Sequence, residues 1–179
     1  MRIAISGKSG CGNTTVSSLV AQQLGYHLIN FTFRNLAEEK GLDFKQICRL
    51  AEESDEIDKE LDRRQVEMAL EQPDCVLGSR LAIWMLSQAE LKVYLTATVE
   101  QRAQRIKMRE GGSFEKRLQE TRLRDSLDSE RYMRIYGIDN SNPDVADLII
   151  DTSTLTAEEV AAIIIATVRQ QSEPTSQKG

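Results

Sequence analysis

Residues 1–25 combine a short strand, a glycine-rich turn and an amphipathic helix in direct succession, which constrains the fold more than any other feature. Residues 2–6 have the pattern of a buried strand, three glycines follow between positions 7 and 12, and Gly25 ends the helical pattern. Glycines let the backbone bend so that successive N–H groups point at one anion, and the start of the helix adds partial positive charge. We therefore expect an α/β protein with a phosphate site after its first strand.

The turn has the spacing Gly7-x4-Gly12-x-Thr14, which matches the P-loop pattern of nucleotide-binding proteins except at position 13. Asparagine stands there in place of lysine, so another group must neutralise the phosphate charge. Backbone N–H groups of the loop are expected to hold the β-phosphate, and the Thr14 hydroxyl to bind Mg²⁺. A strand–turn–helix unit without a ligand is the alternative, and the missing lysine favours it. The predicted ATP-binding residues are Gly7, Lys8, Ser9, Gly10, Cys11, Gly12, Asn13, Thr14 and Thr15.

Composition and charge indicate a soluble, single-domain protein that binds small anions. The 179 residues are 40% hydrophobic and 28% charged, which suits one globular domain, expected over residues 1–170. The net charge of −5 argues against a general nucleic-acid binder, but residues 102–134 hold ten Lys or Arg and only six Asp or Glu. Such a local basic segment suits a small anionic ligand.

Cysteine usage points to a reducing compartment. The three cysteines are an odd number without metal-type spacing, and no targeting or membrane segment is visible, so a cytoplasmic location is expected. Cys11 lies inside the glycine-rich loop. It is either a reactive thiol near a helix start or, the interpretation we favour, a small residue that fits the loop.

Short apolar segments alternate with helical ones along the chain. This order predicts a five-stranded parallel sheet with helices on both faces, in which ligands bind at the carboxyl ends of the strands. The helical segment 113–136 is strongly charged with few large apolar residues, so we expect it to be loosely held. Residues 171–179 are predicted to form a flexible tail. The predicted strands are 2–6, 27–30, 75–78, 91–95 and 147–150, and the predicted helices before the basic segment are 13–24, 33–40, 43–53 and 55–71.

Six motifs spread over almost all of residues 1–170 resemble, in their order, the cytidylate kinases, and within them the small form of archaea and some bacteria. In that form the P-loop lysine is also replaced by a small polar residue, as at Asn13. The resemblance implies a P-loop kinase domain with a helical acceptor-binding insert (residues 33–72) and a mobile lid (residues 105–134). The motifs are Ile3 to Val16, Phe33-Arg34-Asn-Leu-Ala37, Ile57 to Gln65, Ser79-Arg-Leu-Ala-Ile-Trp84, Arg124-Asp125 through Arg131-Tyr132, and Ile135-Tyr-Gly-Ile-Asp139.

The resemblance also implies transfer of the γ-phosphoryl group of ATP to CMP or dCMP, with Mg²⁺ required. This chemistry needs two phosphates held in line, water excluded and negative charge compensated, and arginines serve it because they stay charged and bind phosphate oxygens in pairs. On the matching positions, the implied catalytic residues are Arg80, Arg124, Arg131 and Arg109. The implied acceptor-binding residues are Arg34, Arg80, Asp128, Arg131, Asp62 and Arg63.

Each of these assignments has a structural alternative. Arg34 could be a solvated helix arginine, and Asp62 with Arg63 a solvated helix face. The spacing of Arg124, Asp128 and Arg131 also fits an exposed ladder of ion pairs. Of the three arginines expected around the lid, Arg109 is favoured, and Arg102 and Arg105 could be helix-surface charges.

Three other functions stay open at this point. The chain could phosphorylate another small acceptor such as AMP, shikimate or gluconate. It could be a nucleotide-dependent switch, because Lys8 directly after the first glycine resembles the deviant P-loop of partitioning ATPases, whose lysine reaches phosphate across a dimer. Asn13 would also suit a binding protein without turnover.

Gly78 departs from the family, in which an acidic residue is expected at this position. We expect only nucleotides as partners, with no nucleic acid and no membrane, and a monomer.

Overall fold

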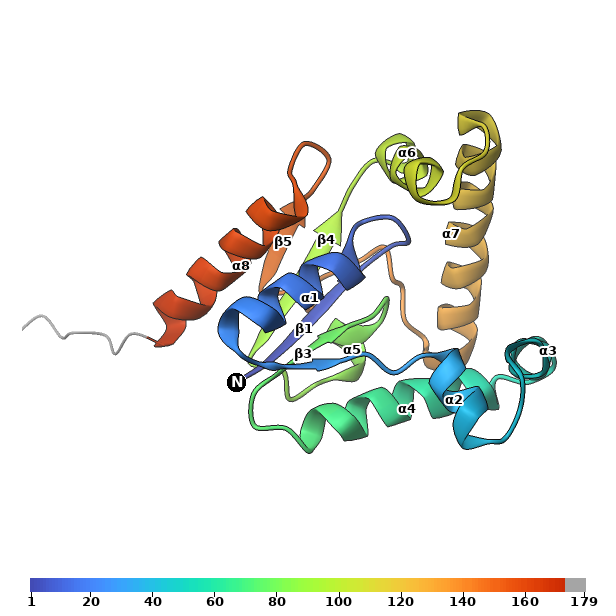
Figure 1. Cartoon of the computed structure of the whole chain (residues 1–179), viewed down its shortest axis with the longest axis horizontal. Coiled ribbons are helices and arrows are strands. Elements are labelled where there is room, and N and C mark those ends of the chain that lie inside the picture. The colour runs from blue at the N-terminus through green and yellow to red at the C-terminus, as the bar shows by residue number, and fades with distance from the viewer. Residues whose placement is uncertain (173–179) are drawn as a thin grey trace, which may run out of the picture.

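The computed structural model describes residues 1–172, which form a single parallel sheet of five strands flanked by helices (Figure 1). The strand order is β2-β3-β1-β4-β5, and every neighbouring pair is parallel. The predicted sheet is confirmed. Its strands are β1 (Arg2–Gly7), β2 (His27–Ile29), β3 (Cys75–Gly78), β4 (Leu91–Thr96) and β5 (Leu148–Asp151).

Alternation along β1 divides the core into two layers, because successive side chains of a strand point to opposite faces. Ile3 and Ile5 pack with helices α1 (Asn13–Leu24) and α8 (Ala157–Ser172) on one face. Ala4 packs on the other face, against residues of α4 (Glu56–Leu70) and α5 (Ala82–Met85). Helices therefore cover both faces, as predicted.

A third, smaller cluster joins α2 (Phe33–Glu39) and α3 (Phe44–Glu53) to α4. Its fully buried members are Leu36 and Ile47, and Phe31 closes it toward the sheet. The segment predicted as an acceptor-binding insert thus has a small apolar core of its own. It stands beyond the carboxyl end of the sheet, opposite α7 (Phe114–Tyr136), as Figure 1 shows.

Helix α7 forms in the charged segment as predicted, and polar contacts hold it more than apolar ones. Its buried residues are Thr121, Asp128 and Tyr132. At its start, Arg117 donates from Nε to the carbonyl of Gly111 at 2.8 Å, which holds the turn from α6 (Val99–Glu110). Near the C-terminus, α8 continues to Ser172, two residues into the predicted tail, and the rest of that tail, residues 173–179, lies outside the described residues. Within residues 1–172 no helix is long and apolar enough to cross a membrane.

Close packing of β3 against α1 explains why glycine, and not an acidic residue, stands at position 78. A Cβ atom at this position would lie 2.2 Å from Ser17 Oγ and 2.7 Å from Ser17 Cβ, so β3 and α1 approach too closely for any side chain. We expect Gly78→Ala to lower the free energy of unfolding by about 2–3 kcal/mol, the cost of overpacking a core contact. Urea unfolding measures it, and Gly78→Ala combined with Ser17→Gly should recover part of the loss. An unchanged midpoint in Gly78→Ala would contradict the packing argument.

Candidate active site

The glycine-rich loop forms the floor of a pocket of about 610 Å³ at the carboxyl end of β1. All of the predicted ATP-binding residues except Gly7, which ends β1, line this phosphate pocket, together with residues of the β3–α5 and β5–α8 connections. Gly10 and Gly12 have φ angles of +86° and +104°, in the left-handed region that favours glycine. These two glycines therefore occupy the positions at which the loop backbone must take left-handed angles.

Side chains from three parts of the chain hold the carbonyl groups of this loop. Asn13 Nδ2 donates to the carbonyl of Gly7 at 2.6 Å. Arg102 Nη1 donates to that of Ser9 at 3.1 Å and Arg105 Nη1 to that of Gly10 at 3.4 Å. Thr152 Oγ1 donates to the carbonyl of Cys11 at 3.3 Å. Asn13 thus acts on the shape of the loop and supplies no charge.

Cys11 does not behave as a reactive thiol in this setting. Its side chain is buried, and burial raises the pKa of the thiol to about 11 although Arg102 and Arg105 act in the opposite direction. At neutral pH the thiol therefore stays protonated. Of the two alternatives, the structure supports the small residue that fits the loop.

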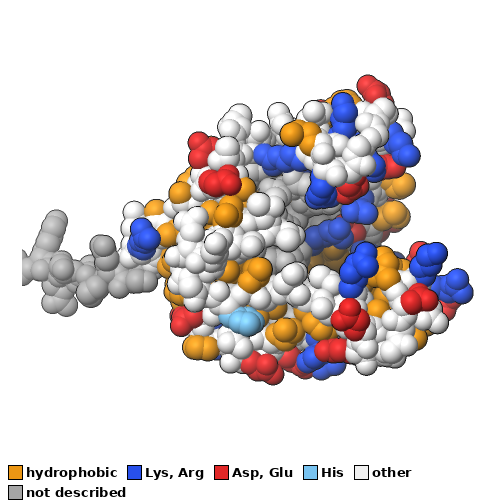
Figure 2. All heavy atoms as spheres, viewed as in Figure 1, with side chains coloured by type: hydrophobic (Ala, Val, Ile, Leu, Met, Phe, Trp, Pro, Cys, Tyr) orange, Lys and Arg blue, Asp and Glu red, His pale blue; other side chains and the backbone are white. Residues whose placement is uncertain are grey.

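Arginines supply the positive charge around the phosphate pocket. Arg80, Arg105, Arg109 and Arg124 line it together with Lys8. Arg109 is mostly exposed and pairs with Glu110 at 2.5 Å. Arg102, in contrast, is buried and donates a hydrogen bond to the loop carbonyl of Ser9. Its interpretation as a helix-surface charge was therefore wrong. Figure 2 shows Lys and Arg side chains gathered around the hollow between the α6–α7 region and the α2–α3 region.

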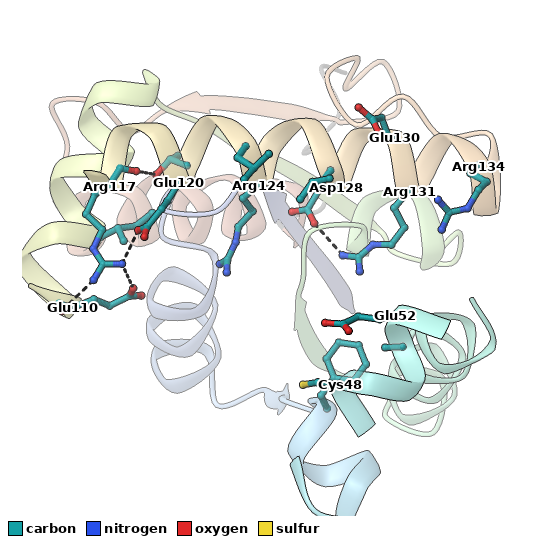
Figure 3. Close-up of a pocket in the computed structure, with 16 residues that line it drawn as sticks. Cys48, Glu52, Glu110, Arg117, Glu120, Arg124, Asp128, Glu130, Arg131 and Arg134 are labelled. Atoms are coloured by element: carbon teal, nitrogen blue, oxygen red, sulfur yellow. Dashed lines mark hydrogen bonds and ion pairs between the residues drawn. The ribbon is translucent and has the colours of Figure 1, made fainter. Parts of the chain in front are cut away.

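A second pocket, of about 870 Å³, lies between α7 and helices α2 and α3 (Figure 3). Arg124, Asp128 and Arg131 line it from α7, and Phe33, Cys48 and Ala51 form an apolar wall on the other side. We call it the acceptor pocket. The spacing of these three wall residues does not distinguish them from core positions, so sequence reasoning missed them.

Asp128 connects two of the predicted arginines. It is 7% exposed, and its carboxylate lies 3.1 Å from Arg80 Nη1 and 2.9 Å from Arg131 Nη2. Arg124 lies outside this cluster, and within residues 1–172 no carboxylate lies within ion-pair distance of its guanidinium. Arg124 lines both pockets and points away from α7 in Figure 3. Of the alternative ladder, the Asp128–Arg131 pair forms but Arg124 is not part of it, and because Asp128 is buried the ladder is not an exposed one.

Three predicted acceptor residues lie outside the lining of both pockets. Arg34 stacks over the ring of Phe44 at 4.5 Å. Arg63 is 60% exposed and pairs with Glu67, as expected for a solvated helix face. Asp62 accepts a hydrogen bond from the Tyr136 hydroxyl at 2.6 Å. Its neighbour on α4, Asp58, is buried, with its carboxylate 3.6 Å from Arg131 Nη1.

The burial of Asp62 has a consequence for stability. Desolvation and the nearby Asp58 raise the pKa of Asp62 to about 6, although the bond from Tyr136 and the charge of Arg131 lower it. A raised pKa means that the folded state binds this proton more tightly than the unfolded state, so stability decreases as pH rises through about 6. Asp62→Asn should therefore stabilise the protein by about 1–2 kcal/mol at pH 7.5 and have little effect near pH 4.5. Thermal unfolding at the two pH values tests this, and an equal effect at both would contradict it.

Comparison with solved structures defines the fold as that of the P-loop kinases. A shikimate kinase from Acinetobacter baumannii superposes with a TM-score of 0.63 at 19% identity, over 97% of this chain and 95% of that chain. A deoxyadenosine kinase from M. mycoides gives a TM-score of 0.57 at 17% identity, over 94% of this chain and 100% of that chain. At these identities the likeness concerns the fold alone.

The sequence relatives narrow the class to one family. The model of the cytidylate kinase-like family matches residues 2–154. A cytidylate kinase from Archaeoglobus fulgidus is 41% identical, with 99% of this chain and 100% of the relative covered. "Cytidylate kinase 2" from Borreliella afzelii is 42% identical, with coverages of 92% and 94%. The chain belongs to the cytidylate kinase-like family, and the resemblance inferred from its motifs is confirmed.

Proposed function

We propose that this kinase transfers the γ-phosphoryl group of ATP to CMP or dCMP, giving ADP and CDP or dCDP. The observation that carries the proposal is that Arg124 lines both the phosphate pocket and the acceptor pocket, so one guanidinium group faces both substrates. The relatives named cytidylate kinases, identical at 41% and 42% over most of the chain, support the choice of acceptor.

On the donor side, loop amides surround the phosphates of ATP and arginines compensate their charge. Thr14 stands in the first turn of α1 and lines the phosphate pocket. A hydroxyl beside phosphates fits Mg²⁺, because this ion keeps several waters and binds substrate phosphates with few protein ligands. Thr14 would hold the ion, which when bound neutralises charge on the phosphates.

Between donor and acceptor, Asp128 orients Arg131, which lines the acceptor pocket, and Arg80, which lines the phosphate pocket, so that both can bind the phosphate of the nucleotide. A guanidinium held by a buried carboxylate loses little freedom when the substrate binds. Phe33, Cys48 and Ala51 give the nucleoside an apolar wall that excludes water. Arg109 would close over the donor from the α6–α7 side.

We propose that the enzyme works as a monomer in the cytoplasm. The rival switch mechanism requires ATP-driven dimerisation. Sedimentation velocity with and without Mg·ATP separates the two. A single monomer peak under both conditions supports the proposal, and an ATP-dependent dimer would contradict it.

An acceptor panel tests the proposed reaction. Wild-type protein is given ATP and Mg²⁺ with CMP, dCMP, UMP, AMP or shikimate, and ADP formation is followed together with the identity of the product. We expect kcat/KM for CMP or dCMP to exceed that for AMP and shikimate by more than about tenfold, the discrimination that a fitted pocket provides. A preference for AMP or shikimate, or no acceptor-dependent ADP at all, would overturn the proposal.

The Lys8 side chain has two alternative roles, which steady-state kinetics can separate. It lines the phosphate pocket. If its ammonium group compensates part of the missing charge at position 13, Lys8→Ala should raise KM for ATP about tenfold, the loss of one charged contact. Unchanged kinetics in Lys8→Ala would make it a solvent-facing loop charge.

A further inference from the structure

We infer that Asp125 and Arg102 form a positioning pair that fixes the phosphate loop to α7 and so aims loop amides at the nucleotide before it binds. This inference rests on the proposed function for its effect on turnover. It concerns two residues that line neither the phosphate pocket nor the acceptor pocket.

Arg102 is buried, Asp125 is half-buried, and the two side chains form a bidentate ion pair. Arg102 is 4% exposed, and its Nη1 and Nη2 atoms lie 2.9 Å and 2.6 Å from the two carboxylate oxygens of Asp125. The same guanidinium donates to the carbonyls of Ser9 at 3.1 Å and Ala97 at 3.3 Å. A fork-shaped cation that is held on its carboxylate side presents its other donors in a fixed direction. Arg102 is therefore committed to the protein and not to the phosphates.

The contact with Ser9 determines where an amide of the loop points. Within a planar trans peptide, the C=O group of one residue and the N–H group of the next point in opposite directions. Because Arg102 holds the Ser9 carbonyl on its own side, the N–H group of Gly10, a residue that lines the phosphate pocket, is turned to the opposite side. Gly10 itself rests on Arg102, since a Cβ there would lie 2.9 Å from Arg102 Cβ.

Asp125 extends this support to the acceptor side. It is adjacent in α7 to Arg124, which lines both pockets. Fixing Asp125 to Arg102 therefore also fixes the backbone that carries Arg124 relative to the loop. Without the carboxylate, Arg102 would be a buried cation lacking its counter-ion, and it would have to move toward solvent or toward the phosphates. Either movement releases the Ser9 carbonyl.

The matched control is a second ion pair between the same two helices. Arg122 Nη2 lies 3.4 Å from Glu100 Oε1, and both side chains are more than half exposed, at 61% and 55%. This pair joins α6 to α7 but has no contact with the loop. Glu100→Gln therefore removes a link between the helices without disturbing Ser9.

The experiment measures binding of Mg·ADP by calorimetry, without any acceptor, and steady-state kinetics with ATP and CMP, for wild type, Asp125→Asn, Asp125→Glu and Glu100→Gln. We expect Asp125→Asn to weaken Mg·ADP binding and raise KM for ATP about tenfold, and to lower kcat by a similar factor, as for misplacement of catalytic groups. KM for CMP should change less than about twofold. Asp125→Glu, which keeps the charge, should recover part of the affinity, and Glu100→Gln should match wild type.

A merely structural role gives a different result, because partial unfolding lowers kcat without changing either KM or the affinity of the folded fraction. That result, or equal losses in Asp125→Asn and Glu100→Gln, would overturn the inference. If Asp125→Asn is unfolded by circular dichroism at the assay temperature, the comparison of Asp125→Glu with wild type decides, and unchanged Mg·ADP affinity there overturns the inference as well. A wild type that binds Mg·ADP but ignores CMP would refute the proposed acceptor while leaving this test intact.

Discussion

Replacing Arg124 by alanine is expected to lower kcat for CMP phosphorylation about a thousandfold, the range measured for arginines that stabilise phosphoryl transfer. Arg124 lines both pockets, and within residues 1–172 no carboxylate lies within ion-pair distance of its guanidinium. Its charge is thus available to the group in transfer, and the loss should fall mainly on kcat, because the interaction strengthens in the transition state. Steady-state kinetics with both substrates varied measures it.

The neighbouring arginine provides a control for this prediction. Arg122 is on the same helix, exposed, and paired with Glu100. Arg122→Ala should keep kcat within about twofold of wild type, as for other exposed ion pairs. Arg124→Lys should recover only part of the rate, since an ammonium group cannot bind two oxygens in parallel. A kcat in Arg124→Ala within tenfold of wild type would remove Arg124 from the catalytic residues.

Gly10→Ala is expected to abolish nucleotide binding and to destabilise the fold by about 3 kcal/mol. Two effects add at this position. The φ angle of +86° is unfavourable for alanine, and the new Cβ would lie 2.9 Å from Arg102 Cβ and 3.0 Å from Arg102 O. The loop must therefore move off Arg102, and its amides lose their common direction. Calorimetry with Mg·ADP and urea unfolding report the two losses separately.

Gly25→Ala is the control that separates backbone strain from the steric clash between a Cβ at position 10 and Arg102. Gly25 ends α1 with a φ angle of +69°, and no atom lies within 4 Å of the position that a Cβ would take. We expect a loss of about 1 kcal/mol in stability from the left-handed conformation alone, and nucleotide affinity as in wild type. Equal nucleotide affinity in Gly10→Ala and Gly25→Ala would show that the shape of the loop does not depend on Arg102.

The fold and the turns of the glycine-rich loop were predictable because local patterns determine them. Short apolar strands alternating with helices specify a parallel sheet, and Gly10 and Gly12 occupy backbone angles that glycine alone adopts readily. Asp128 and Arg131 are three residues apart, a spacing that places them on one helical face, and in the structure their side chains are in contact at 2.9 Å. These features depend on residues close in sequence, so the chain reveals them directly.

The remaining features depend on how distant elements meet. In a charged helix, Arg102 has the sequence context of a surface residue, and it is buried because α7 and the glycine-rich loop cover it. Arg63 has the same kind of context, but no element covers it, and it stays on the surface. No periodicity distinguishes the two. The same applies to Phe33 and Cys48, which form the apolar wall of the acceptor pocket only because α2 and α3 stand opposite α7.

In the proposed function, backbone amides and arginines bind the triphosphate without a lysine at position 13. Asn13 holds the carbonyl of Gly7, while Arg80, Arg105, Arg109 and Arg124 surround the pocket. Calorimetric titration of the wild-type protein with a non-hydrolysable ATP analogue in the presence of Mg²⁺ tests this directly. We expect one site per chain with a dissociation constant in the micromolar range. Absence of binding at millimolar concentrations of the analogue would contradict it.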